Sequence, residues 1–95
     1  MYYAVIFTST RSKIEEGYAE MAEKMEQLAK QQPGFIGVES ARNEIGITVS
    51  YWKSLEAIKN WKMNLDHLDA QQKGRSTWYK NYKVRIAKVE REYEF

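Results

Sequence analysis

Hydrophobic positions along the chain repeat at two different spacings, and these spacings divide it into predicted strands and helices. The segment YYAVIFT, Tyr2–Thr8, concentrates the tyrosine, valine, isoleucine and phenylalanine that β-strands favour. Its odd-numbered and even-numbered positions are both apolar, so both faces of the strand would be apolar. A strand of this kind is covered on both sides, which predicts a further layer on each face of its sheet.

The next segment predicts an amphipathic helix that ends at Pro33-Gly34. From Ile14 onward its apolar residues follow helical spacing, and the opposite face carries Glu, Lys and Gln. Ser12 with Glu15 three residues later forms a capping-box pattern. The pattern predicts that the helix begins at Ser12.

Two strands follow, Phe35–Arg42 and Ile45–Trp52, around a short turn at Asn43-Glu44. Alternating apolar residues on both sides of such a turn predict a β-hairpin.

A second helix is predicted between Ser54, which suits an N-cap, and Gly74, which suits a stop. Its apolar stripe consists of Leu55, Ile58, Trp61, Leu65 and Leu68. Asparagine favours caps over helix interiors, so Asn64 marks a place where this helix would divide in two.

The chain closes with a predicted strand over residues 80–95, whose apolar positions change parity along its length. A bulge near Ala87 would explain the change. A strand end that leaves its own sheet to meet a partner would explain it equally well.

The predicted order is strand, helix, strand, strand, helix, strand, which is typical of the ferredoxin-like α+β sandwich. Two helices would cover one face of a four-stranded antiparallel sheet. The other face would expose an apolar patch, and pairing two such sheets face to face would bury it. The pattern therefore predicts a homodimer.

Composition is consistent with one small domain spanning residues 1–95. There are no cysteines and one histidine, which exclude disulfides and make a metal site unexpected. The N-terminus lacks a signal-peptide pattern and no apolar run could span a bilayer, so a cytoplasmic protein without membrane contact is expected. A small domain without disulfides or metals is often stabilised by self-association.

The charge of the chain does not predict a nucleic-acid partner. The net charge is only +2. Basic residues are frequent in the last quarter, but Glu90, Glu92 and Glu94 interleave with them. A solvated edge of the sheet is therefore expected there, where charges also discourage unwanted strand pairing.

Several motifs together resemble the antibiotic biosynthesis monooxygenase (ABM) family. They are Pro33-Gly34-Phe35 opening the second strand, Tyr51-Trp52 ending the third, the segment Trp61…His67, and the segment from Trp78-Tyr79 to Glu90-Arg91. The resemblance covers nearly the whole chain in the same order. It implies a dimeric α+β barrel, in agreement with the homodimer predicted above.

The resemblance implies a monooxygenase that oxidises a small phenolic or quinol compound with molecular oxygen and without a cofactor. An alternative is a non-catalytic dimer that binds or senses a small aromatic ligand. Another is haem degradation, which a related branch performs with an Asn in the first strand, a Trp matching Trp61 and a His after the second helix. Here the first strand has no Asn, and Gln71 stands at the position of that His, one turn after His67.

Three residues of the second helix are candidates for catalysis. His67 suits a general base, because its unperturbed pKa is near ~6.5; a half-exposed surface histidine is the alternative. Trp61 matches the family's pocket tryptophan, although it also lies on the apolar stripe expected to pack in the core. Asn64 lies three residues from each, so a continuous helix would bring the three near one edge, and its amide could donate to a substrate oxygen.

Four more residues are candidates for substrate binding. Trp52 closes a strand just before a helix, where pockets often open. Trp78 and Tyr79 precede the last strand and would form a pocket wall or, preferably, a dimer contact. Arg75 would stabilise an oxyanion, or lie solvated beside Gly74.

Overall fold

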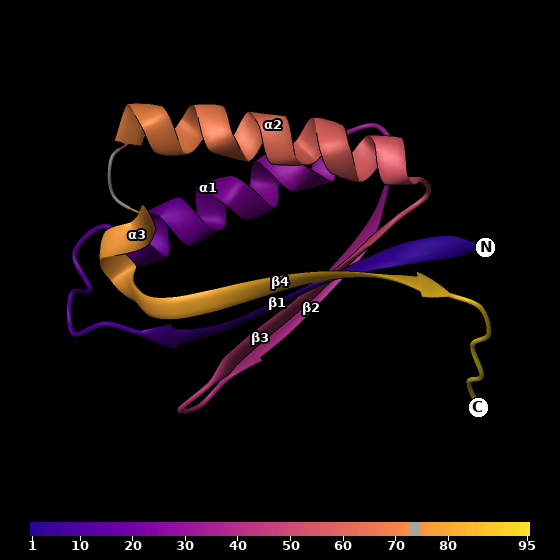
Figure 1. Cartoon of the computed structure of the whole chain (residues 1–95), viewed down its shortest axis with the longest axis horizontal. Coiled ribbons are helices and arrows are strands. Elements are labelled where there is room, and N and C mark those ends of the chain that lie inside the picture. Colours follow the sequence, from indigo (N-terminus) through magenta and orange to yellow (C-terminus); the bar gives the residue numbers. More distant parts are fainter. Residues whose placement is uncertain (73–74) are drawn as a thin grey trace.

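The computed structural model describes residues 1–72 and 75–95, with the side chains of residues 1–66 and 77–95. Figure 1 shows a layer of helices lying on a β-sheet. The elements, in chain order, are β1 (Tyr2–Arg11), α1 (Tyr18–Lys30), β2 (Phe35–Arg42), β3 (Gly46–Trp52), α2 (Leu55–Gln72), α3 (Arg75–Trp78) and β4 (Tyr79–Val89).

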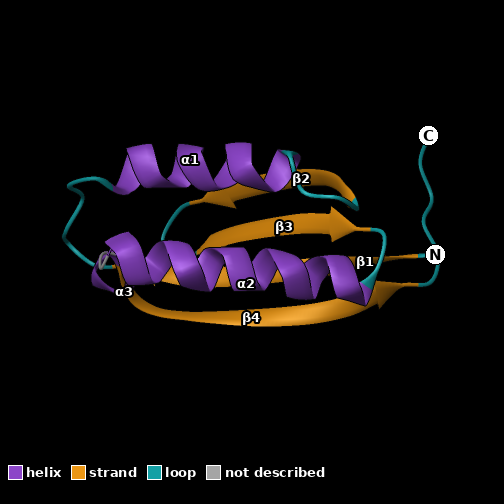
Figure 2. Cartoon of the chain, turned by 90° about the horizontal axis from the view of Figure 1, so that it is seen from above, coloured by secondary structure: helices purple, strands orange, loops and turns teal. Residues whose placement is uncertain are grey.

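The sheet has four strands in the order β2-β3-β1-β4, and each neighbouring pair is antiparallel. Seen from above, α1 lies toward the β2 side of the sheet and α2 toward the β4 side (Figure 2). The predicted ferredoxin-like α+β arrangement is therefore confirmed, with the addition of the short helix α3. The hairpin is confirmed as well, with β2 over the predicted residues and β3 beginning one residue later.

The core lies between the sheet and the two long helices. Trp52 is fully buried at the end of β3, and it packs with Ile58 and Trp61 of α2 and Ala29 of α1. Ser54 caps α2 as predicted, because its hydroxyl accepts a hydrogen bond from the Ala57 backbone N–H at 3.0 Å.

The predicted start of the first helix is wrong. Helix α1 begins at Tyr18, after Gly17 with a φ of 79°, and no side chain caps it. The Ser12 hydroxyl instead accepts a hydrogen bond from the Ile14 backbone and donates one to the Thr77 carbonyl. A contact with a segment far away in the chain thus replaces the local capping box.

The predicted break at Asn64 is also wrong, because α2 runs continuously from Leu55 to Gln72. Its side chain donates a hydrogen bond back to the Asn60 carbonyl at 3.2 Å, which satisfies the amide within the helix. Leu55 was expected in the apolar stripe but is 54% exposed. The predicted stop at Gly74 lies outside the described residues.

Strand β4 ends at Val89 and does not continue to Phe95. Its register with β1 is regular past Ala87, and its one irregularity lies at Thr10/Arg11 of β1, so no bulge occurs at the predicted place. The change of parity falls where the strand ends. Tyr93 in the terminal segment is 84% exposed.

The face of the sheet that carries no helix is open to solvent. Tyr3 and Trp52, which are register partners, face the helices, so residues of the other parity point to the open side. The apolar side chains on the open face include Tyr2, Ala4, Ile6, Ile47, Val49 and Tyr51.

Within the described chain, no helix is long and apolar enough to cross a membrane.

Candidate functional site

The short helix α3 is attached to the chain before α1 by hydrogen bonds around Trp78. The Ser12 backbone N–H and the Arg11 Nε both donate to the Trp78 carbonyl, at 2.8 and 3.2 Å. The Ser12 hydroxyl donates to the Thr77 carbonyl at 2.7 Å. At its other end, the Trp78 indole donates to the Glu16 carbonyl at 2.8 Å. The indole is therefore held in one orientation.

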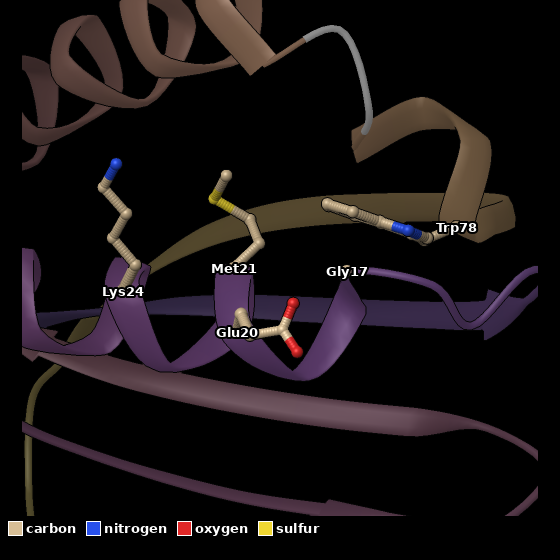
Figure 3. A pocket seen from close by; sticks show the side chains of 5 residues that line it. All are labelled: Gly17, Glu20, Met21, Lys24 and Trp78. Carbon is tan, nitrogen blue, oxygen red and sulfur yellow. The ribbon is translucent and has the colours of Figure 1, made fainter.

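A pocket of about 250 Å³ opens beside this indole. Figure 3 shows Met21 and Trp78 on either side of it, with Lys24 and Glu20 on the turns of α1 that border it. Trp78 and Met21 are buried, whereas Glu20 and Lys24 are exposed. An apolar lining with a few polar groups at the edge is typical of small-molecule sites.

Gly17 completes the lining of the pocket. A Cβ atom at this position would lie 3.4 Å from the Trp78 ring, and the φ of 79° disfavours any other residue. Glycine thus allows the chain before α1 to run close to the indole.

Five aromatic side chains form a cluster behind the pocket, which we call the aromatic cluster. Tyr18 meets both Trp78 and Tyr79 edge to face, with ring centroids 5.9 Å apart in each pair. Phe7 of β1 continues the cluster, at 5.4 Å from Tyr79 and 5.3 Å from Tyr82. Edge-to-face and offset contacts of this kind are favourable and give the pocket a rigid wall.

The apolar surface of the aromatic cluster continues along the helix-facing side of β4. Val84 pairs with Phe7 of β1, and Ile86 pairs with Val5. Although they face the helix layer, Val84 and Ile86 are 47% and 52% exposed. The helices therefore leave part of β4 uncovered beside the pocket.

Trp52 and Trp61 lie together, away from the aromatic cluster. Their rings stack with centroids 6.0 Å apart and planes at 25°, and Phe35 meets Trp52 edge to face. The Trp52 indole donates to the Ser50 hydroxyl at 2.9 Å. In this chain the pair forms the centre of the core cluster under α2.

Asn64 is not part of the core cluster that contains this tryptophan pair. Asn64 is exposed and donates to the Gln32 side chain, just after α1, at 3.1 Å. His67 belongs to α2 and Arg75 opens α3, but their side chains lie outside the described part of the chain. The predicted set thus divides into a buried Trp52–Trp61 pair, an Asn64 contact between helices, and the Trp78–Tyr79 region beside the pocket.

The lining residues from α1 were not among the predicted site residues. Met21 belonged to the predicted apolar stripe, and Lys24, three residues later, lies beside that stripe at its polar border. The sequence shows no local sign that α3 packs against the start of α1, because this contact joins segments about sixty residues apart.

Among the described side chains, two tyrosines with shifted pKa values, Tyr2 and Tyr51, lie on the open face of the sheet. Tyr51 donates a hydrogen bond to Glu39 at 2.6 Å, and this bond, with partial burial and the negative charge, raises the pKa of Tyr51 to about 12. Loss of solvent and a hydrogen bond to Glu92 raise the pKa of Tyr2. Among the described side chains, no group of three or more potential ligands is arranged to hold a metal ion.

Comparison with known proteins gives the same overall picture of the fold. The model of a family described as "Antibiotic biosynthesis monooxygenase" matches residues 1–73. A curated relative, the uncharacterized protein YqjZ of Bacillus subtilis, is 55% identical over 93 residues, covering 96% of this chain and 82% of its own length.

The solved structures that are similar over almost the whole chain include the following two proteins. Rv0793 from Mycobacterium tuberculosis has a TM-score of 0.81 at 10% identity, covering 99% of this chain and 100% of its own. SnoaB, a cofactor-independent oxygenase from Streptomyces nogalater, has a TM-score of 0.76 at 11% identity, covering 96% of this chain and 95% of its own. At these identities the likeness shows a shared fold.

Proposed function

Because this chain belongs to the antibiotic biosynthesis monooxygenase family, we propose that it oxidises a small phenolic or quinol compound with molecular oxygen and without a cofactor. The observation that carries the proposal is the pocket of about 250 Å³ that Met21 and Trp78 line together with the charged residues Glu20 and Lys24. The fold that it shares with a cofactor-independent oxygenase also supports it.

The substrate ring would lie against the surface that Met21 and Trp78 form together. A thioether beside an aromatic ring makes favourable contacts with flat apolar molecules, and the fixed indole provides a rigid surface. The Lys24 ammonium group would lie near the substrate oxygen and stabilise the phenolate. Preorganised charge of this kind lowers the energy of the anion that must form before oxygen reacts.

The reaction needs one oxygen molecule and the removal of two protons from the substrate, one from the phenolic oxygen and one from the ring carbon that is oxidised. His67 of α2 is the proposed base, and it removes the phenolic proton. The electron-rich phenolate then gives an electron to oxygen, and the two radicals combine at the ring carbon. The peroxide formed at the ring carbon takes up the proton that the base removed, and the same carbon then loses its hydrogen as a proton while the O–O bond breaks. A phenol and oxygen thus give a quinone and one water molecule, and each of these products receives one of the two atoms of O2.

The test is oxygen uptake by the purified protein with a panel of hydroquinones, anthrones and catechols, comparing Lys24→Gln with Lys30→Gln. Both lysines are exposed on α1, but only Lys24 lines the pocket. We expect Lys24→Gln to lower kcat/KM about tenfold, because one electrostatic contact to the anion is lost, and Lys30→Gln to leave it unchanged. His67→Gln should abolish the rise of kcat with pH that a histidine base produces.

If the two lysine variants were equally active, the substrate would not bind in the pocket that Met21 and Trp78 line, and the proposed site would be wrong. Saturable binding of a panel compound without oxygen uptake would contradict the enzyme and identify a binding or sensing module. A Soret-absorbing complex with hemin that bleaches on addition of a reductant would identify haem degradation.

We also propose that the chain forms a homodimer through the open face of its sheet. This face carries Tyr2, Ile6, Val49 and Tyr51, and Ile47 on it is 47% exposed. An apolar surface of this extent on a small domain marks an interaction site. Light scattering should give a mass of twice 11.3 kDa, and a mass of one chain would contradict the dimer.

A further inference from the structure

The four residues around the start of α1 that line the pocket form one continuous patch. Gly17, Glu20, Met21 and Lys24 are spaced three or four residues apart, and residues at this spacing are neighbours on a helix. Trp78 packs against Met21 at the side of the patch. A molecule in the pocket would thus lie along successive turns of α1, beside both charged side chains (Figure 3).

The two charged side chains of this patch are not paired with each other. Glu20 and Lys24 have the spacing at which helical ion pairs form, and Lys62 and Asp66 of α2 form such a pair at 3.1 Å. Among the described residues, however, Glu20 takes part in no ion pair and no side-chain hydrogen bond. Figure 3 shows its carboxylate and the Lys24 ammonium group pointing away from each other. The carboxylate is therefore available to a molecule in the pocket.

The oxidation proposed above has a second proton to remove, and His67 accounts only for the first. After oxygen has bound, the oxidised ring carbon carries both a hydrogen and a hydroperoxide group. The electron pair of its C–H bond must form the new C=O bond while the O–O bond breaks and hydroxide leaves. A base beside this carbon accelerates the step, because it accepts the proton as the carbonyl group forms.

We propose that the Glu20 carboxylate is this second base, and that it removes the proton from the ring carbon opposite the phenolic oxygen. The inference rests on the proposed oxygenase and adds to it the base and the position of oxidation. With the phenolic oxygen at Lys24, Glu20 lies one helical turn away, and Cβ atoms at this spacing are about 5–6 Å apart. This separation is similar to the span from a phenolic oxygen to the hydrogen on the opposite carbon of its ring.

The protons balance within the pocket. Glu20 takes the proton from the ring carbon and becomes a carboxylic acid, and the hydroxide that leaves the peroxide then takes the same proton. The products are water and a quinone whose two oxygen atoms lie on opposite carbons. Glu20 returns to its carboxylate form, ready for the next turnover.

The test compares Glu20→Gln with Glu23→Gln, using α-naphthol as the substrate. Both glutamates are exposed on α1, but of the two only Glu20 lines the pocket. We expect Glu20→Gln to take up oxygen in the first turnover as fast as the unmodified chain, but to release quinone about tenfold or more slowly, because a general base is lost. The missing quinone should be recovered as hydroperoxide, measured by its oxidation of ferrous iron. Glu23→Gln should match the unmodified chain in both measurements.

Deuterium at the ring carbon opposite the hydroxyl of α-naphthol identifies the step that Glu20 serves. In Glu20→Gln, loss of the proton from this carbon limits the rate, so the deuterated substrate should give quinone more slowly than the ordinary one. In Glu23→Gln, the two substrates should differ no more than they do with the unmodified chain. Because Glu20 lies in the first turn of α1, where a negative charge stabilises the helix, circular dichroism verifies that both variants are folded.

The outcomes separate this inference from the function on which it rests. If the unmodified chain takes up no oxygen with α-naphthol or with any compound of the panel, the oxygenase itself is wrong. An ortho-quinone product, or uptake with panel compounds but none with α-naphthol, contradicts the position of oxidation. Equal quinone release by Glu20→Gln and Glu23→Gln, or a Glu20→Gln variant that shows neither hydroperoxide nor an isotope effect, shows that Glu20 is not the base and leaves the oxygenase standing.

Discussion

Individual residues in this chain take their roles from distant partners more than from their neighbours in sequence. Ser12 has the pattern of a helix cap, yet its hydroxyl bonds to the Thr77 carbonyl, and the helix begins at Tyr18. Trp78 was predicted near a site because of its position before the last strand. Its orientation depends on the Glu16 carbonyl, which no local pattern indicates.

The hydrogen bond between Tyr51 and Glu39 leads to a prediction about a single side chain. Glu39→Gln should lower the pKa of Tyr51 from about 12 toward the ordinary 10.0, because the charged acceptor of its hydrogen bond is removed. The ¹³Cζ resonances of labelled tyrosines, with Tyr51 assigned from Tyr51→Phe, measure this pKa directly. Glu44→Gln, in the exposed hairpin turn, is the control.

The direction of the Tyr51 pKa shift determines how the stability of the fold depends on pH. A pKa that is higher in the folded chain means that folding favours the neutral phenol, so its contribution is complete below about pH 10. It is lost as the pH rises through about 12. An unchanged Tyr51 pKa in Glu39→Gln would contradict the assignment of the shift to this hydrogen bond.

The positions of helices and strands were predicted well where the spacing of hydrophobic residues along the sequence is enough to determine them. The hairpin and the N-cap of α2 follow from local chemistry and are confirmed. The end of β4 was misplaced, because Val89, Tyr93 and Phe95 share one parity although pairing with β1 stops at Val89. Periodicity does not show where a neighbouring strand ends.

The turn between α1 and β2 gives a prediction at the scale of elements. Gly34 has a φ of 87°, and a Cβ atom there would lie 2.7 Å from Cβ of Ala57 in α2. Gly34→Ala should therefore destabilise the fold by about 2–4 kcal/mol, the sum of backbone strain and overpacking. Chemical denaturation measures the change.

Gly37→Ala is the comparison for that measurement, because nothing lies within 4 Å of a Cβ atom at Gly37. It should change the free energy of unfolding by only about 0.5 kcal/mol. If the two substitutions had equal effects, the close approach of the turn to α2 would not be the reason that residue 34 must be glycine.

For the whole molecule, the order of elements and the open apolar face were visible in the sequence, and the pocket was not. The first strand is apolar on both sides, and this property indicated both the helix layer on one face and the apolar surface on the other. The pocket depends on how α3 packs against the start of α1, which is a contact between distant segments. Family membership supports the oxygenase chemistry proposed for this pocket, whereas the fold alone would not.

The most direct test of the proposed oxygenase is a reaction under ¹⁸O₂ with the best substrate of the panel, using protein dialysed against chelator and free of added flavin, metal or hemin. The proposal predicts that each product molecule contains one ¹⁸O atom and that the second appears in water, at a rate proportional to protein concentration. A product without the label, or turnover that requires an added cofactor, would contradict it.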